Sequence, residues 1–61
     1  METYKLTAFK PDGEKLLDES FQASSEEEAK TIGEKMLSEK NLQDNTYRCT
    51  SPQGKLVLFH P

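Results

Sequence analysis

The stretch that decides the fold is residues 25–42, SEEEAKTIGEKMLSEKNL, which has the pattern of a single amphipathic helix. Its apolar members follow the i, i+3, i+4, i+7, i+8 spacing that forms one stripe along a helix. They are Ala29, Ile32, Gly33, Met36 and Leu37. Because the opposite positions are polar, we predict a helix over residues 25–41 whose stripe must be covered by another part of the chain.

The start of this helix is marked by capping residues. Ser25 followed by Glu28 has the form of a capping box, in which the serine hydroxyl accepts a hydrogen bond from a free amide of the first turn. Ser24 followed by Glu27 has the same form one residue earlier, so the cap falls at one of these two serines. The glutamates at 26–28 lie at the positive end of the helix dipole, where negative charge is stabilising.

The other end of the helix is marked by Asn41, a residue that tolerates the left-handed conformation. The apolar Leu42 that follows is expected to fold back on the last turn, as in a C-terminal cap. Gly33 is the unusual member of the stripe, because glycine costs about 1 kcal/mol relative to alanine inside a helix. We therefore predict that Gly33 allows a close approach between the helix and the surface beneath it.

The composition indicates one small folded domain, residues 1–61. The chain is 33% hydrophobic and 31% charged, and its apolar residues are periodic rather than scattered. A domain of this size buries only about 60% of the surface of its unfolded chain, so its stability is small unless it packs well or self-associates. The single cysteine excludes an internal disulfide.

Charge and hydropathy limit the classes of partner. The net charge is −3 and the sequence pI is about 5.0. The chain therefore lacks the basic surface that binding of duplex nucleic acid requires, and a nucleic-acid partner is not favoured. No apolar run approaches the length of a membrane-spanning helix, and the N-terminal METYKLTAFK contains no apolar signal region. We therefore expect a cytoplasmic protein with a reduced thiol and no membrane partner.

The chain before the helix, residues 2–23, has the pattern of a β-hairpin. Two runs of alternating polarity flank Pro11-Asp12-Gly13, which is a strong turn signal. A two-residue turn at Asp12-Gly13 pairs Tyr4 with Phe21, Leu6 with Glu19, Ala8 with Leu17 and Phe9 with Leu16. This register gathers apolar residues on one face with Glu19 as the exception. A three-residue loop would mix both faces, whereas a four-residue loop would keep the same pairs.

The chain after the helix, residues 46–60, predicts a second hairpin around the turn Pro52-Gln53-Gly54. In the preferred register Cys49 faces Leu58 and Tyr47 faces His60. The residues that then share a face are Tyr47, Cys49, Leu56 and Leu58, with Val57 and Phe59 on the other. A slipped register that places Val57 and Phe59 with Tyr47 and Cys49 is nearly as good.

These elements predict an α+β fold of order ββαββ, a four-stranded sheet of two hairpins with one helix packed on one face. The run LVLF at residues 56–59 is apolar at consecutive positions, which is typical of a strand that is not at the edge of a sheet. We therefore expect the fourth strand to lie beside the first, in the order 2-1-4-3.

The side chains that could carry chemistry are few. His60 is the only histidine, Cys49 lies in the middle of a strand on the proposed core face, and neither has a partner in the sequence pattern for a metal or nucleophilic site. The glutamates at 26–28 are explained by the helix start, and the three glycines do not form a phosphate loop. We expect no catalytic residue, no metal, no cofactor and no enzymatic activity.

One face of the sheet is expected to stay uncovered, because a single helix covers only the other. In the preferred register this face carries Phe9, Leu16, Val57 and Phe59, which would form one apolar patch if the order 2-1-4-3 holds. Exposed contiguous apolar patches mark interaction sites, so we predict a non-catalytic interaction module that docks this free sheet face or an edge strand onto a protein, including a second copy of the chain. The alternative is that a few exposed apolar side chains are ordinary, or that the slipped register buries Val57 and Phe59.

A second functional hypothesis is single-stranded nucleic-acid binding on the same face. Aromatic side chains on a sheet can stack on bases, and the basic residues Lys5, Lys10 and Arg48 could contact the phosphates. The acidic pI opposes this hypothesis.

Two long segments also carry a resemblance. YKLTAFKPDGEKLLDESFQA and SSEEEAKTIGEKMLSEKNL, together with the turn SPQGK, resemble the small uncharacterised YhzD-like proteins of Bacillus and its relatives. The similarity extends over nearly the whole chain. It implies a bacterial cytosolic setting, and no catalytic signature accompanies it.

Overall fold

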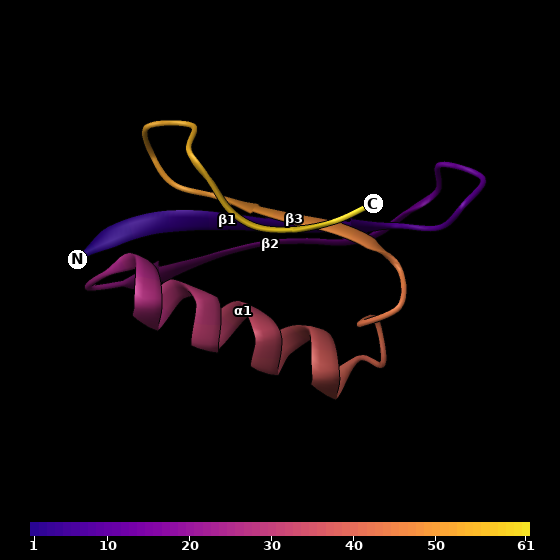
Figure 1. The fold of residues 1–61 in the computed structure, drawn as a ribbon, viewed down its shortest axis with the longest axis horizontal. Helices are drawn as coiled ribbons and strands as arrows, with labels where there is room; N and C mark the ends of the chain where they lie inside the picture. The colour runs from indigo at the N-terminus through magenta and orange to yellow at the C-terminus, as the bar shows by residue number, and fades with distance from the viewer.

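Four antiparallel strands form one sheet, and a single helix covers one of its two faces (Figure 1). The computed structural model describes residues 1–61. The elements in chain order are β1 (Glu2–Phe9), β2 (Lys15–Ala23), α1 (Glu26–Glu39), β3 (Thr46–Thr50) and β4 (Leu56–His60). The predicted ββαββ fold is therefore confirmed. No helix in the structure is both long enough and apolar enough to cross a membrane.

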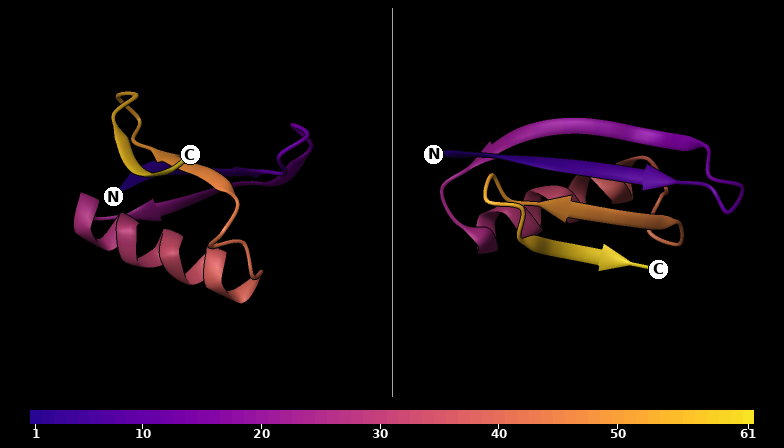
Figure 2. Two further views of the ribbon diagram at one scale, coloured as in Figure 1. Left: turned by 45° about the vertical axis from the view of Figure 1, so that its right-hand side comes forward. Right: turned by 90° about the horizontal axis from the view of Figure 1, so that it is seen from above.

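The strand order is β2-β1-β3-β4, so the predicted order 2-1-4-3 is wrong. The two hairpins meet through β1 and β3, whose pairing places Leu6 opposite Cys49, and β4 lies at the outer edge (Figure 2, right). The consecutive apolar residues of β4 thus do not reflect a central position. A β-bulge within β4 places Val57 and Leu58 toward α1 and leaves Leu56 and Phe59 on the other face, as described below.

The predicted registers of both hairpins are confirmed away from the turns. The first pairs Tyr4 with Phe21, Leu6 with Glu19 and Ala8 with Leu17, and the second pairs Tyr47 with His60 and Cys49 with Leu58. The predicted two-residue turn at Asp12-Gly13 is wrong, because the Lys10 amide donates to the Glu14 carbonyl at 2.8 Å and closes a three-residue loop. This loop does not mix the two faces, since each hairpin has one bulge near its turn that restores the predicted pairs. The first bulge leaves Leu16 unpaired and sets Phe9 opposite Lys15, so the predicted Phe9–Leu16 pair does not form. The second leaves Val57 unpaired and sets Thr50 opposite Leu56.

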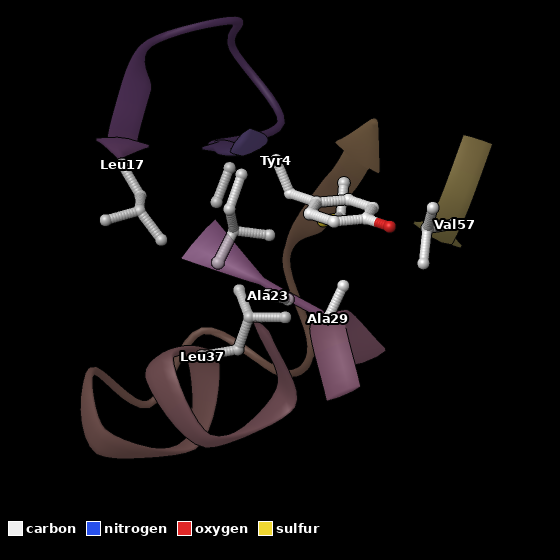
Figure 3. Packing of buried hydrophobic residues seen from close by; sticks show 9 residues of the cluster. Tyr4, Leu17, Ala23, Ala29, Leu37 and Val57 are labelled. Atoms are coloured by element: carbon white, nitrogen blue, oxygen red, sulfur yellow. The ribbon is translucent and has the colours of Figure 1, made fainter. Parts of the chain in front are cut away.

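The core lies between the sheet and α1 (Figure 3). Its buried members are Tyr4, Leu6, Ala8, Leu17, Ala23, Ala29, Leu37, Cys49 and Val57. The helix approaches the sheet closely at Gly33, where a Cβ atom would lie 2.9 Å from Leu58 Cδ1 and 4.0 Å from Phe21 Cζ. Gly33 thus lies between one side chain of β4 and one of β2, which confirms the close approach that its presence in the stripe predicted.

Both helix ends form as expected, with the N-cap at Ser25. Its hydroxyl accepts a hydrogen bond of 3.1 Å from the Glu28 amide, while the Glu28 carboxylate accepts from the amide and hydroxyl of Ser24 at 2.9 and 3.1 Å. At the other end Asn41 has φ 56, and the Leu42 amide donates to the Leu37 carbonyl at 2.8 Å. This is a Schellman arrangement, and it ends the helix at Glu39 rather than at 41.

Candidate interaction surface

The sheet face opposite α1 is open, and the registers place its side chains in rows that run across the strands. Residues that are directly paired share a face. One row consists of Asp18, Thr7, Arg48 and Phe59, and the next consists of Ser20, Lys5, Thr50 and Leu56. Both rows change from charged or polar side chains at β2 to apolar side chains at β4.

The bulge in β4 determines which apolar side chains reach this open face. Because Val57 is the extra residue, Leu56 and Phe59 both fall on the open face, although three positions separate them. Leu56 is 48% exposed and Phe59 is 51% exposed, whereas Val57 is 9% exposed and belongs to the core cluster. The predicted exposure of Val57 is therefore wrong. The bulge turns its side chain toward α1.

Arg48 lies beside Phe59 in the same row. Its guanidinium carbon is 5.9 Å from the centroid of the Phe59 ring, which is within the range of a cation–π contact. This contact holds a planar cation next to an exposed aromatic ring at the rim of the sheet. We call Arg48, Leu56 and Phe59 together the outer strip.

The other two residues of the predicted patch lie elsewhere. Phe9 is in β1, opposite Lys15 and Thr46, and Leu16 is the bulged residue of β2. Since β3 lies between β1 and β4, Phe9 and Phe59 are on strands that do not touch. The expectation of one continuous patch is wrong, because it depended on β4 lying next to β1. Both Phe9 and Leu16 are partly buried.

The β2 side of the open face is occupied by ion pairs. The Asp18 carboxylate is 3.6 Å from Lys5 Nζ and 3.0 Å from Lys15 Nζ. The hydrogen bond from Lys15 is the largest cause that holds the pKa of Asp18 below its ordinary value. Lys10 pairs in turn with Glu14 at 3.3 Å. Apart from the terminal Met1, the exposed large hydrophobic side chains lie in β4, whereas most of the cations on this face are already paired.

Sequence reasoning missed Leu56, which the preferred register placed on the core face. The reason is that a bulge is detected in a sequence as a break in alternation, and LVLF has no alternation to break. The only local signal is the turn, where the Ser51 amide donates to the Lys55 carbonyl and the Ser51 hydroxyl accepts from the Lys55 amide. That pattern fixes the loop and leaves the bulge undetermined.

The two side chains with reactive atoms lie apart from the outer strip. Cys49 is fully buried, and this burial raises the pKa of its thiol. His60 stacks on Tyr47 with ring centroids 5.4 Å apart, and its Nδ1 atom is buried without a hydrogen-bond partner. The structure contains no pocket and no group of three or more potential metal-ligating side chains. The absence of enzymatic activity stays a prediction.

The fold and the outer strip define the protein as a small α+β domain of ββαββ order, with one sheet face covered by its helix and the other open. The chain belongs to the YhzD-like protein family, whose model matches residues 1–61. It is 50% identical over 60 residues to "Uncharacterized protein YhzD" of Bacillus subtilis (strain 168), and the match covers 98% of each chain. No solved structure matches the chain. The resemblance seen in the sequence is thus confirmed, and the relative supports a bacterial protein.

Proposed function

We propose that this protein is a non-catalytic protein-interaction module that binds a protein partner through the outer strip. The observation that carries this proposal is that Leu56 and Phe59 are half exposed on the one sheet face that no helix covers. Aromatic and arginine side chains dominate the binding energy of protein interfaces, and the outer strip pairs one of each. We also propose a cytoplasmic location, which the single unpaired cysteine supports.

The size of the outer strip sets a requirement on the partner. Complete burial of a leucine or phenylalanine side chain stabilises by about 1.5–3 kcal/mol, so the exposed halves of Leu56 and Phe59 together can contribute about 2 kcal/mol. Association costs at least about 4 kcal/mol in lost freedom of motion. The partner must therefore also contact the groups around the strip, and the nearest of these is the backbone edge of β4.

The substitution Phe59→Lys tests the proposal, with Gln22→Lys as a matched control. Gln22 is exposed, lies on the other edge strand, and receives the same added charge. Protein complexes are captured from extracts of the source cells with each variant and with the wild type. We expect a protein that the wild type and Gln22→Lys retain and that Phe59→Lys loses, while circular dichroism shows that all three are folded.

Two results would contradict the proposal. If Phe59→Lys unfolds the domain, Phe59 belongs to the core and the outer strip is not a binding surface. If Phe59→Lys is folded but neither loses a retained protein nor changes its own association state, the outer strip does not bind proteins.

A second candidate function is single-stranded nucleic-acid binding, which the contact between Arg48 and Phe59 favours because a base could stack on the ring beside a cation. Lys5 and Lys10 are engaged with Asp18 and Glu14, and the net charge of −3 repels phosphates. Fluorescence anisotropy with a mixed-sequence oligonucleotide tests this candidate. The absence of a salt-sensitive shift would exclude it.

A further inference from the structure

The two edges of the sheet differ in how they are protected against pairing with another strand. β2 carries Lys15, Asp18 and Glu19, and Glu19 lies in the row of Leu6 and Cys49 on the helix side of the sheet. Charged residues on an edge strand, especially inward-pointing ones, are the usual means by which proteins block such pairing. β4, LVLFH, carries no Asp, Glu, Lys or Arg. Its outward-facing backbone groups are therefore available to another strand.

We propose that the outer edge of β4 pairs antiparallel with β4 of a second copy of this chain. The strand order of the assembly is then β2-β1-β3-β4 followed by the same four strands in reverse. This inference rests on the proposed function, because it uses the outer strip as the binding surface and names the partner. It adds the backbone contacts that the outer strip alone cannot supply.

The regular part of β4 fixes the register of this pairing. The bulge at Val57 limits it at one end, and Pro61, which has no amide hydrogen, limits it at the other. The stretch between them is Leu58–His60, whose central residue is Phe59. A two-fold axis through this centre places Phe59 opposite Phe59 of the second copy, and Leu58 opposite His60.

This register extends the open-face row in a favourable way. The row of Asp18, Thr7, Arg48 and Phe59 continues into Phe59, Arg48, Thr7 and Asp18 of the second copy. The exposed Phe59 ring of each copy packs against the Phe59 ring of the other as a cross-strand pair, and the two rings separate the two Arg48 cations. A two-fold axis perpendicular to the sheet keeps both helices on the same face.

The other possible strand pairings are less favourable. Two copies of β2 would bring like charges together, since a two-fold axis at Glu19 or Asp18 sets each carboxylate opposite itself. Pairing β4 of one copy with β2 of another would set the apolar side chains of β4 against the charged strand. That arrangement also leaves a free edge at each end, so it grows without closing. Pairing through β4 on both sides closes at two copies.

The interface is small. A standard interface covers about 800 Å² of each partner, which is roughly one fifth of the 3995 Å² surface of this chain, whereas β4 has only five residues. We therefore expect a reversible dimer that dissociates on dilution. Sedimentation equilibrium of the full chain should show a mass that rises with concentration from 7.0 kDa toward twice that value.

The experiment compares the wild type with Phe59→Lys and the control Gln22→Lys. Phe59→Lys sets two cations opposite each other at the two-fold axis, so we expect dimer formation to require at least about ten times more protein. Gln22→Lys should behave as the wild type. Phe59→Thr, which retains a strand-forming residue and removes the ring, should weaken the dimer if the lysine variant does not fold.

Amide hydrogen exchange of the wild type distinguishes edge pairing from stacking of the open faces. Edge pairing predicts that extra protection at high concentration is confined to the amides of β4. The inference would be overturned by a chain that remains monomeric over the whole range of protein concentration, or by a dimer whose extra protection lies outside β4. A monomer that still loses a captured protein on Phe59→Lys would overturn self-pairing while supporting the proposed function.

Discussion

The contact between Gly33 and Leu58 makes Gly33→Ala a sensitive probe of how the helix meets the sheet. Two effects of similar size oppose each other. Alanine is favoured over glycine in a helix by about 1 kcal/mol. The new Cβ atom, however, would lie 2.9 Å from Leu58 Cδ1, and this methyl group must move until the distance reaches at least the 3.4 Å of an ordinary contact.

The cost of that movement can be estimated from the side chain that moves. Leu58 Cδ1 is the end of a half-buried leucine, so the side chain can rotate away from its preferred conformation at a cost of about 0.5–1.5 kcal/mol. The gain and the cost then nearly cancel. We expect Gly33→Ala to change the free energy of unfolding of the wild type by no more than about 0.5 kcal/mol.

The background Leu58→Val separates the two effects, because valine has no δ-carbon and remains favourable in a strand. In the Leu58→Val background, Gly33→Ala should raise the free energy of unfolding by the full helix preference of alanine over glycine, about 1 kcal/mol. In a domain of this size that difference raises the thermal midpoint by roughly 4–8 °C, which circular dichroism resolves. Ser38→Ala, on the exposed side of α1, should give the same shift in both backgrounds. Equal stabilisation by Gly33→Ala in both backgrounds would refute the close contact.

Three further changes test the helix ends and the open face. Ser25→Ala removes the cap that accepts from Glu28 and should lower the free energy of unfolding by about 1 kcal/mol in urea titrations. Asn41→Gly relieves the left-handed backbone at φ 56 and should raise the free energy of unfolding by up to about 1 kcal/mol, whereas Asn41→Val should lower this free energy. The pKa of Asp18 is lowered from 3.8 by Lys15, so the stability that its ionised form contributes is present above pH 3.8 and is lost as the pH falls toward the folded-state pKa. Urea midpoints of Asp18→Asn should therefore depend less on pH in this acidic range than those of the wild type.

The elements that sequence reasoning predicted well are those whose signals are local. Ser25 and Glu28 lie within one helical turn of each other, and Asn41 precedes Leu42 directly, so each cap is determined by neighbouring residues. The position of the first turn, Pro11-Asp12-Gly13, was predicted from its own residues in the same way, but its three-residue loop and the bulge at Leu16 that restores the register were not. The burial of Gly33 also followed from its position within the stripe.

The elements that could not be predicted depend on contacts between the two hairpins. The order of the strands is decided by which hairpin edge joins β1, and the choice between β3 and β4 is not encoded in either turn. The position of Val57 depends on a bulge, which consecutive apolar residues conceal. The predicted patch depended both on the strand order and on a β4 without a bulge. For this reason only Phe59 of its four residues lies in the outer strip.

The failed prediction of strand order and the proposed dimer concern the same five residues. LVLFH has the composition of an internal strand, yet the structure of one chain places it at an edge. The bulge accounts for Val57 and Leu58, which pack toward α1, but gives no reason for apolar side chains at Leu56 and Phe59 on the open face. Pairing of β4 with β4 of a second copy makes the strand internal, and the composition then agrees with its position. If the chain is instead monomeric at all concentrations, the proposed function assigns the cover of Leu56 and Phe59 to a different protein, and it predicts that Phe59→Lys loses that protein.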